Sequence, residues 1–155
     1  MKKSTYTKKA NKRGVARLLA VQAAYQMELT GNDVWEVVKE FEIHNFPPND
    51  IDGIGYLEAD PQWFRKVILG IVSDQKYLDP LIRSYLSDDW PLSRVDSLLR
   101  SILRAGVWEI KNCLDVPLVV AINEYVDIAK AFFEDGDEVQ LVNGVLHNIG
   151  HDIRG

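Results

Sequence analysis

Apolar residues recur every three or four positions along most of this 155-residue chain, a spacing that places them on one face of an α-helix. The pattern is clearest in residues 116–150, where two apolar stretches flank the polar break Glu134-Asp135-Gly136. Pro117 suits the start of the first stretch, because a helix leaves its first N–H groups unpaired. Gly150 suits the end of the second. These residues therefore predict a helical hairpin.

The same periodicity continues toward the N-terminus. A first helix is predicted over 11–29 and a second after Asp33, whose carboxylate can cap a helix. Residues 45–60 contain two prolines and two glycines, a composition that indicates a surface loop. Asp60-Pro61 then resembles a cap followed by a first helical residue.

The middle of the chain predicts three further helical segments. An apolar face begins at Trp63, is interrupted by the polar stretch 74–79 and resumes over 81–86. The next helix is expected from Ser93, which with Asp96 has the spacing of a capping box, to about Cys113. No stretch shows the alternation of a strand. We predict an all-α fold of about seven helices, with a flexible basic arm over 1–10 and a single domain over 11–155.

Composition agrees with a soluble, cytoplasmic protein. Hydrophobic residues make up 46% of the chain and charged residues 26%, which is ordinary for a globular domain. The single cysteine cannot form an internal disulfide. No apolar run approaches the roughly 18 residues that span a bilayer, and no signal peptide is evident. No membrane association is therefore expected.

Charge is distributed unevenly. The net charge is −5, yet residues 1–17 hold seven of the 18 basic residues and no acid. The remaining chain carries 11 basic residues against all 23 acidic ones. Basic arms of this kind bind polyanions, and a solvated tail that only aids solubility fits the composition equally well. Lys9, Arg13 and Arg17 recur at four-residue spacing, with Lys12 beside them.

Candidate catalytic and metal-binding groups do not form a constellation. Cys113 has no basic neighbour or helix N-terminus that would lower its pKa, so a buried, inert thiol is the better interpretation. His147 and His151 lack a third ligand at the usual spacing. No glycine-rich phosphate loop is present. We expect neither catalysis nor a cofactor.

Polar residues inside apolar stretches indicate structural roles. Arg104 and Glu124 each interrupt an apolar helix face, and a buried arginine requires a carboxylate. We therefore predict a structural cluster that includes Arg104 and Glu124, with Glu109 close by in sequence. Gly144, which follows Asn143, is better explained by close helix packing than by ligand binding.

Aromatic residues add to the case for nucleic acid. Tyr25 and Tyr77 lie in polar settings, and rings beside a cationic stripe suit single-stranded RNA, whose bases stack while phosphates meet lysine and arginine. Most tyrosines at helical spacing are core residues, so this pattern favours RNA binding only weakly.

Several motifs together resemble one family. They are V-P-x-x-V-A-I-N-E-x-V-x-x-A-K from Val116, V-N-G-V-L from Val142, A-V-Q-A-x-Y-Q from Ala20, Y-L-D-x-L-I-x-x-Y-L from Tyr77 and L-R-x-x-x-x-E-I from Leu103. In this order and spacing, across residues 13–149, the chain resembles the NusB family of transcription antitermination factors. The resemblance implies two small helical bundles packed together and no catalysis.

The resemblance also implies partners and contact residues. Family members bind the boxA element of nascent ribosomal RNA transcripts together with the ribosomal protein NusE, within the RNA polymerase antitermination complex. The positions that match the family's RNA contacts are Lys9, Lys12, Arg13, Arg17, Tyr25, Tyr77 and Asp137. The family also carries the same residue types at Arg104, Glu109, Glu124, Asn143 and Gly144, which fits structural roles there. The NusE surface is expected around 90–109.

Two departures from the family pattern leave alternatives open. Gln140 and Leu141 stand where relatives often have a basic residue and a phenylalanine, and Gly14 and Val15 break the arginine run. A non-catalytic protein-interaction scaffold with generic polyanion binding is therefore one alternative. The NusB-like domain of an RNA methyltransferase is another, although no nucleotide-binding glycine-rich strand–loop–helix follows in this chain.

Overall fold

The computed structural model describes residues 12–45, 59–91 and 95–155, and in these ranges it contains six α-helices and no strand. They are α2 (Lys12–Thr30), α3 (Val34–Asn45), α4 (Pro61–Arg83), α5 (Ser97–Asn112), α6 (Leu118–Phe133) and α7 (Asp137–Arg154). The all-α prediction is confirmed. The predicted arm over 1–10 lies outside the described residues. No described helix combines the length and the hydropathy needed to cross a membrane.

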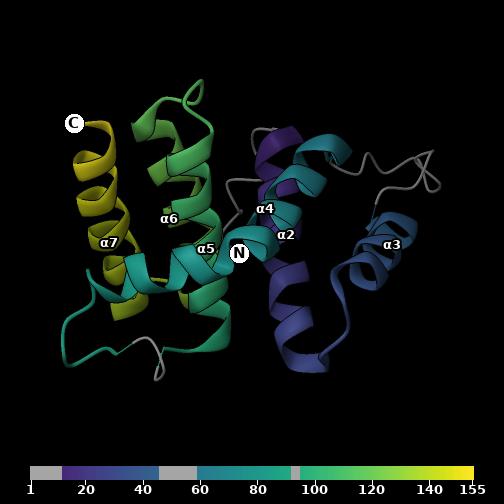
Figure 1. Cartoon of the computed structure of the whole chain (residues 1–155), viewed down its shortest axis with the longest axis horizontal. Helices are drawn as coiled ribbons and strands as arrows, with labels where there is room; N and C mark the ends of the chain where they lie inside the picture. The colour runs from purple at the N-terminus through teal and green to yellow at the C-terminus, as the bar shows by residue number, and fades with distance from the viewer. Residues whose placement is uncertain (1–11, 46–58, 92–94) are drawn as a thin grey trace.

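The helices form two groups that share α5. Figure 1 shows α5, α6 and α7 on one side of the molecule, α2 and α3 on the other, and α4 running from the second side across toward the first. Helix α5 packs against both groups, because it contacts α2, α4, α6 and α7. Every residue from 101 to 110 is buried. The central helix is therefore enclosed on all sides.

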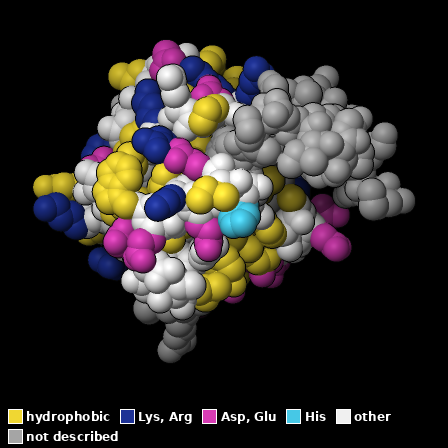
Figure 2. Space-filling model, turned by 90° about the vertical axis from the view of Figure 1, so that its right-hand side faces the viewer, with side chains coloured by type: hydrophobic (Ala, Val, Ile, Leu, Met, Phe, Trp, Pro, Cys, Tyr) yellow, Lys and Arg dark blue, Asp and Glu magenta, His cyan; other side chains and the backbone are white. Residues whose placement is uncertain are grey.

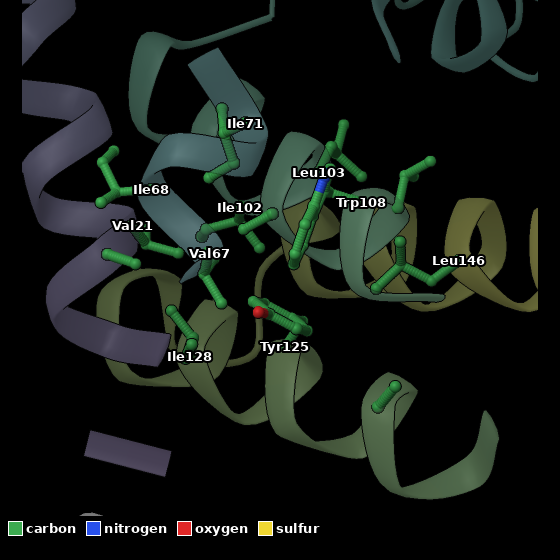
Figure 3. Close-up of a cluster of buried hydrophobic side chains, with 14 of the residues drawn as sticks. Val21, Val67, Ile68, Ile71, Ile102, Leu103, Trp108, Tyr125, Ile128 and Leu146 are labelled. Carbon is green, nitrogen blue, oxygen red and sulfur yellow. The ribbon is translucent and has the colours of Figure 1, made fainter. Parts of the chain in front are cut away.

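The core is continuous from one group to the other. Figure 3 shows buried side chains from α2, α4, α5, α6 and α7 pointing toward one another around the Tyr125 ring. The labelled members are Val21, Val67, Ile68, Ile71, Ile102, Leu103, Trp108, Tyr125, Ile128 and Leu146. Burial of these apolar surfaces is the main driving force that holds the two groups together.

Two predicted helix starts are confirmed by their hydrogen bonds. Asp33 Oδ1 accepts the backbone N–H groups of Trp35 and Glu36 at 2.7 and 3.1 Å. Asp60 Oδ1 accepts those of Gln62 and Trp63 at 3.0 Å. Each carboxylate thus satisfies N–H groups that have no partner inside their helix.

Two boundaries in the middle of the chain differ from the sequence prediction. Helix α4 runs unbroken through 74–79, because Asp74 Oδ2 accepts the Trp108 indole N–H at 3.1 Å and Leu78 between the polar residues is buried. The seventh predicted helix is thus the end of α4. Helix α5 starts at Ser97, since Asp96 is its cap and bonds the Leu98 N–H at 2.8 Å. The predicted start, Ser93, lies outside the described residues.

Gly150 does not end the last helix, which continues to Arg154. A Cβ at Gly150 would lie 2.5 Å from a Leu118 methyl carbon, so this glycine allows α6 to approach α7. The extra turn is anchored by the Arg154 guanidinium, which donates to the carbonyl oxygens of Ile110, Cys113 and Val116 at 3.0, 3.0 and 2.6 Å.

Gly144 does not have the close-packing role that was predicted from the sequence. A Cβ built there meets no atom of another element within 4 Å, and Gly144 and its neighbour Asn143 are both exposed. Close approach occurs instead at Gly70, where a Cβ would lie 2.1 Å from Trp108 Cε2. The glycine that allows close helix packing is therefore Gly70 and not Gly144.

Alanine substitutions at Gly70 and Gly144 should have opposite effects on the free energy of unfolding. Gly70→Ala should lower the free energy of unfolding by about 1–3 kcal/mol, because the indole of Trp108 must move. Gly144→Ala should raise it by about 0.5–1 kcal/mol, since alanine has the higher helix propensity and the space is open. Urea denaturation followed by circular dichroism measures both. A stabilised Gly70→Ala variant would contradict the packing of α4 against α5.

Candidate nucleic-acid interface

The first turn of α2 carries the exposed cations Lys12 and Arg13. The backbone N–H of Asp60 donates to the Lys12 carbonyl oxygen at 3.1 Å, so the starts of α2 and α4 lie side by side. The first turn of α2 contains no acidic residue. The positive ends of two helix dipoles therefore add to the two side-chain charges. Lys9, the next predicted contact, lies outside the described residues.

Arg13 is held against an aromatic ring. Its guanidinium carbon lies 3.9 Å from the centroid of the Trp63 ring in α4. Trp63 is itself 4% exposed, so one face of a fixed ring supports the cation. This arrangement orients an exposed guanidinium while it leaves the charge without a carboxylate partner among the described residues.

Arg17, one turn further along α2, points into the molecule and is 2% exposed. Its Nε and Nη2 donate to Glu109 Oε1 and Oε2 at 2.9 and 2.7 Å, and Nη1 donates to Glu124 Oε1 at 3.1 Å. The Tyr125 hydroxyl donates to Glu109 Oε1 at 2.8 Å. This cluster of Arg17, Glu109, Glu124 and Tyr125 joins α2, α5 and α6.

Burial disfavours the charged forms of the residues in this cluster, whereas hydrogen bonds between opposite charges favour them. Burial disfavours the guanidinium of Arg17, but the hydrogen bonds and attraction of Glu109 outweigh this cost and raise the pKa of Arg17. For Glu124, burial is the larger effect and raises the pKa of its carboxyl, with Arg17 opposing the shift. The prediction that Arg17 contacts RNA is therefore corrected: in this structure its guanidinium is enclosed and already bound.

Arg104 belongs to a second cluster. Its Nε and Nη2 donate to Asp79 Oδ1 and Oδ2 at 2.8 and 2.9 Å, and its Nη1 donates to Glu28 Oε2 at 3.1 Å. Arg100 also binds Glu28. The sequence prediction that Arg104 and Glu124 share a cluster is wrong, because Arg104 binds Asp79 and Glu28 whereas Glu124 binds Arg17. Both remain structural in the sense that each is held by an opposite charge.

The remaining predicted contacts are dispersed. Tyr25 is half-buried beside a hollow between α2 and the end of α6, Tyr77 is 60% exposed on α4, and Asp137 is the exposed first residue of α7. No hydrogen bond, ion pair or ring contact among the described residues joins these three to one another. Lys76 Nζ lies 5.3 Å from the Tyr77 ring centroid.

The structure places Cys113 in the core and the rings of His147 and His151 against each other. Cys113 is buried, and this burial raises the pKa of its thiol, which disfavours the reactive thiolate. The rings of His147 and His151 lie 4.3 Å apart between centroids. Within the described ranges, no group of three or more potential ligands could hold a metal ion.

Comparison with known proteins decides the family. The model of the NusB family matches residues 15–151. The transcription antitermination protein NusB of Brucella ovis is 58% identical over 146 residues, which cover 94% of this chain and 84% of that protein. The chain belongs to the NusB family.

Solved structures show the same fold. NusB of T. maritima superposes with a TM-score of 0.74 at 27% identity and covers 92% of each chain. A structure described as antitermination factors NusB and NusE in complex with double-stranded RNA gives a TM-score of 0.73 at 24% identity, over 91% of this chain and 97% of that one. The family resemblance noted in the sequence is confirmed by the family model and the Brucella relative, and these structures agree in fold.

Two residues near Lys12 and Arg13 were not among the predicted site residues. Trp63 was assigned only to an apolar face, and Lys66, one turn later, was not assigned at all. The sequence could not identify these two residues as site candidates, because their position near the cations of α2 depends on the start of α4 lying beside that of α2. No local pattern in either segment predicts that contact.

Removing the central carboxylate should be strongly destabilising. Glu109→Gln leaves the buried guanidinium of Arg17 with only Glu124, and an unbalanced buried charge costs about 3–5 kcal/mol. Thermal unfolding should show a midpoint lower by about 2–4 °C per kcal/mol. Glu40→Gln, an exposed carboxylate on α3, is the matched control. A Glu109→Gln variant as stable as the control would contradict this role.

Glu124 should contribute a stability that depends on pH. Its pKa is raised above 4.5 in the folded state, so the native protein binds this proton more readily than the unfolded chain does. The contribution is therefore largest at low pH and falls as pH rises through the window above 4.5. Chemical denaturation of wild type and Glu124→Gln across pH 4–8 measures it. The stability difference, wild type minus variant, should decrease with pH, and a rising difference would reverse the assigned sign.

Proposed function

We propose that this protein is an RNA-binding transcription antitermination factor that binds boxA-type RNA of ribosomal RNA operon transcripts together with NusE. The observation that carries the proposal is the exposed pair Lys12 and Arg13 at the start of α2, with Arg13 held on the Trp63 ring. Membership of the NusB family supports it. So does the name of the Brucella relative, an antitermination protein.

Lys12 and Arg13 are proposed to bind phosphates, together with Lys9 of the preceding segment. Tyr25 and Tyr77 are proposed as stacking rings, since a base can lie on an accessible ring face. Asp137, exposed at the start of α7, is proposed to border the strand. Arg17 acts differently, because it fixes the orientation of α2 through Glu109.

The proposed NusE surface is narrower than the sequence indicated. Residues 101–110 are buried, with Arg104 at the wall of a hollow, so the accessible described part of the expected region lies mainly before residue 101. A hollow lies there between α2, α4 and α5, lined by Glu28, Val72, Asp79, Arg100 and neighbouring side chains. NusE is the partner named in the solved NusB–NusE–RNA structure, and the hollow offers charged and apolar groups for such a protein.

Binding of RNA alone should be weak. Leu141, which replaces the phenylalanine of many relatives, packs against the hydrophobic core, so no ring is offered at that position. Gln140 is exposed and uncharged. The face nearest α3 mixes lysine and arginine with acidic and hydrophobic side chains (Figure 2), which is not the arrangement of a polyanion site.

Fluorescence anisotropy of a labelled boxA-like RNA and of a scrambled RNA, with and without NusE and across a salt series, tests the proposal. We expect boxA to be preferred, and the preference to strengthen with NusE. The Lys12→Ala/Arg13→Ala variant should lower the salt slope by about 1.4, because each lost phosphate contact lowers it by about 0.7 for single strands.

Equal, purely salt-driven binding to both RNAs would reject the proposal. The loss of the basic residue and ring at Gln140 and Leu141 would then favour a helical scaffold that binds proteins and has only generic affinity for polyanions. Retained binding of NusE, measured separately without RNA, would support that second function.

A further inference from the structure

Three cations surround one buried indole. The Trp63 ring centroid lies 3.9 Å from the guanidinium carbon of Arg13, 4.9 Å from Lys66 Nζ and 5.6 Å from the guanidinium carbon of Arg17. Arg13 and Arg17 come from α2, whereas Lys66 comes from the second turn of α4. The cationic group at the start of α2 thus extends onto a neighbouring helix.

Among the described residues, Arg17 is the only one of these three cations with a carboxylate partner. Arg17 is bound by Glu109 and Glu124, and Arg65, which precedes Lys66, is bound by Glu42 at 2.5 and 2.8 Å. Among the described residues, no carboxylate lies within salt-bridge distance of Arg13 or Lys66. The chain has 23 acidic residues and 18 basic ones, yet these two cations have no carboxylate partner among the described residues. Two neighbouring cations of this kind repel each other. An anion between them would relieve that repulsion.

The ring itself supplies a second, independent observation. Trp63 is 4% exposed, and its Nε1 is buried without an acceptor among the described residues. Buried indole N–H groups usually have a partner. Among the described residues, the ring that carries both exposed cations thus also has a buried donor without an acceptor. A ring fixed in the core also limits the motion of the cations that rest on it, which reduces the entropy lost on binding.

We propose that Lys66 is a further contact for the RNA backbone, so that the bound strand passes from the start of α2 over the first two turns of α4. The inference rests on the proposed function, since it names a residue of the same site. Lysine binds phosphate as a point charge. Because phosphate contacts carry no sequence information, Lys66 contributes affinity and leaves the choice of RNA unchanged.

The test compares Lys66→Ala with wild type in the same anisotropy salt series, on the boxA-like and the scrambled RNA. We expect a salt slope lower by about 0.7 and binding weaker by about fivefold near 0.1 M salt, equally for both RNAs. Lys66→Arg should keep the wild-type slope. Lys39→Ala, which removes an exposed lysine from α3, is the matched control and should change neither quantity.

The outcomes separate this inference from the function on which it rests. If wild type prefers boxA and Lys66→Ala has an unchanged slope, the inference is wrong and the function stands. If wild type shows no boxA preference, the function fails, yet a reduced slope in Lys66→Ala still identifies a phosphate contact. A variant that loses NusE binding without RNA while its RNA slope is unchanged would assign Lys66 to an acidic protein surface and overturn the inference.

Discussion

A buried guanidinium requires carboxylates, and meeting that requirement fixes how the helices are arranged. Arg17 reaches Glu109 in the enclosed central helix and Glu124 in α6, so α2 has one rotational setting relative to both. Because residues four apart lie on one helix face, Arg13 follows the same face as Arg17 but emerges at the end of the helix. The cationic row is therefore a single pattern with two roles. Its inner member, Arg17, joins three helices, and its outer member, Arg13, is exposed on the Trp63 ring.

This arrangement reconciles an RNA-binding role with a net charge of −5. At physiological ionic strength the Debye length is about 8 Å, so distant acidic residues are largely screened from the strand. Local charge decides binding instead. At the start of α2 the described cations lie beside two helix N-termini and a fixed ring, while several acids elsewhere are occupied: Glu42 binds Arg65, Asp79 binds Arg104 and Glu28 binds Arg100. Because these acidic residues are already paired with arginines, they do less to offset the positive charge at the start of α2.

The sequence predicted what local physics decides. Helical periodicity and the caps at Asp33 and Asp60 depend on neighbours a few residues away, and these predictions agree with the structure. It failed where the partner is distant. Arg17 and Glu109 are 92 positions apart, and a pattern that identifies a cation on a helix cannot tell a phosphate ligand from a buried carboxylate. The same limit explains the wrong pairing of Arg104 with Glu124 and the packing role given to Gly144. Lys66 was not predicted because a single lysine on an exposed helix face carries no functional signal in the sequence. Only the fold brings Lys66 and Arg13 to the same Trp63 ring.

The two proposed surfaces occupy opposite ends of α2. Lys12 and Arg13 begin the helix, whereas Glu28, near its end, joins Arg100 and Arg104 at the hollow proposed for NusE. Sixteen residues of helix separate Lys12 from Glu28, about 24 Å at 1.5 Å per residue. The helix between them is anchored by Arg17 and packed on α4 and α5, so it has little freedom to transmit a change of shape. In the proposed arrangement, a partner at the far end would strengthen RNA binding by offering further contacts to the same strand. Two weak sites that share one ligand gain from effective concentration.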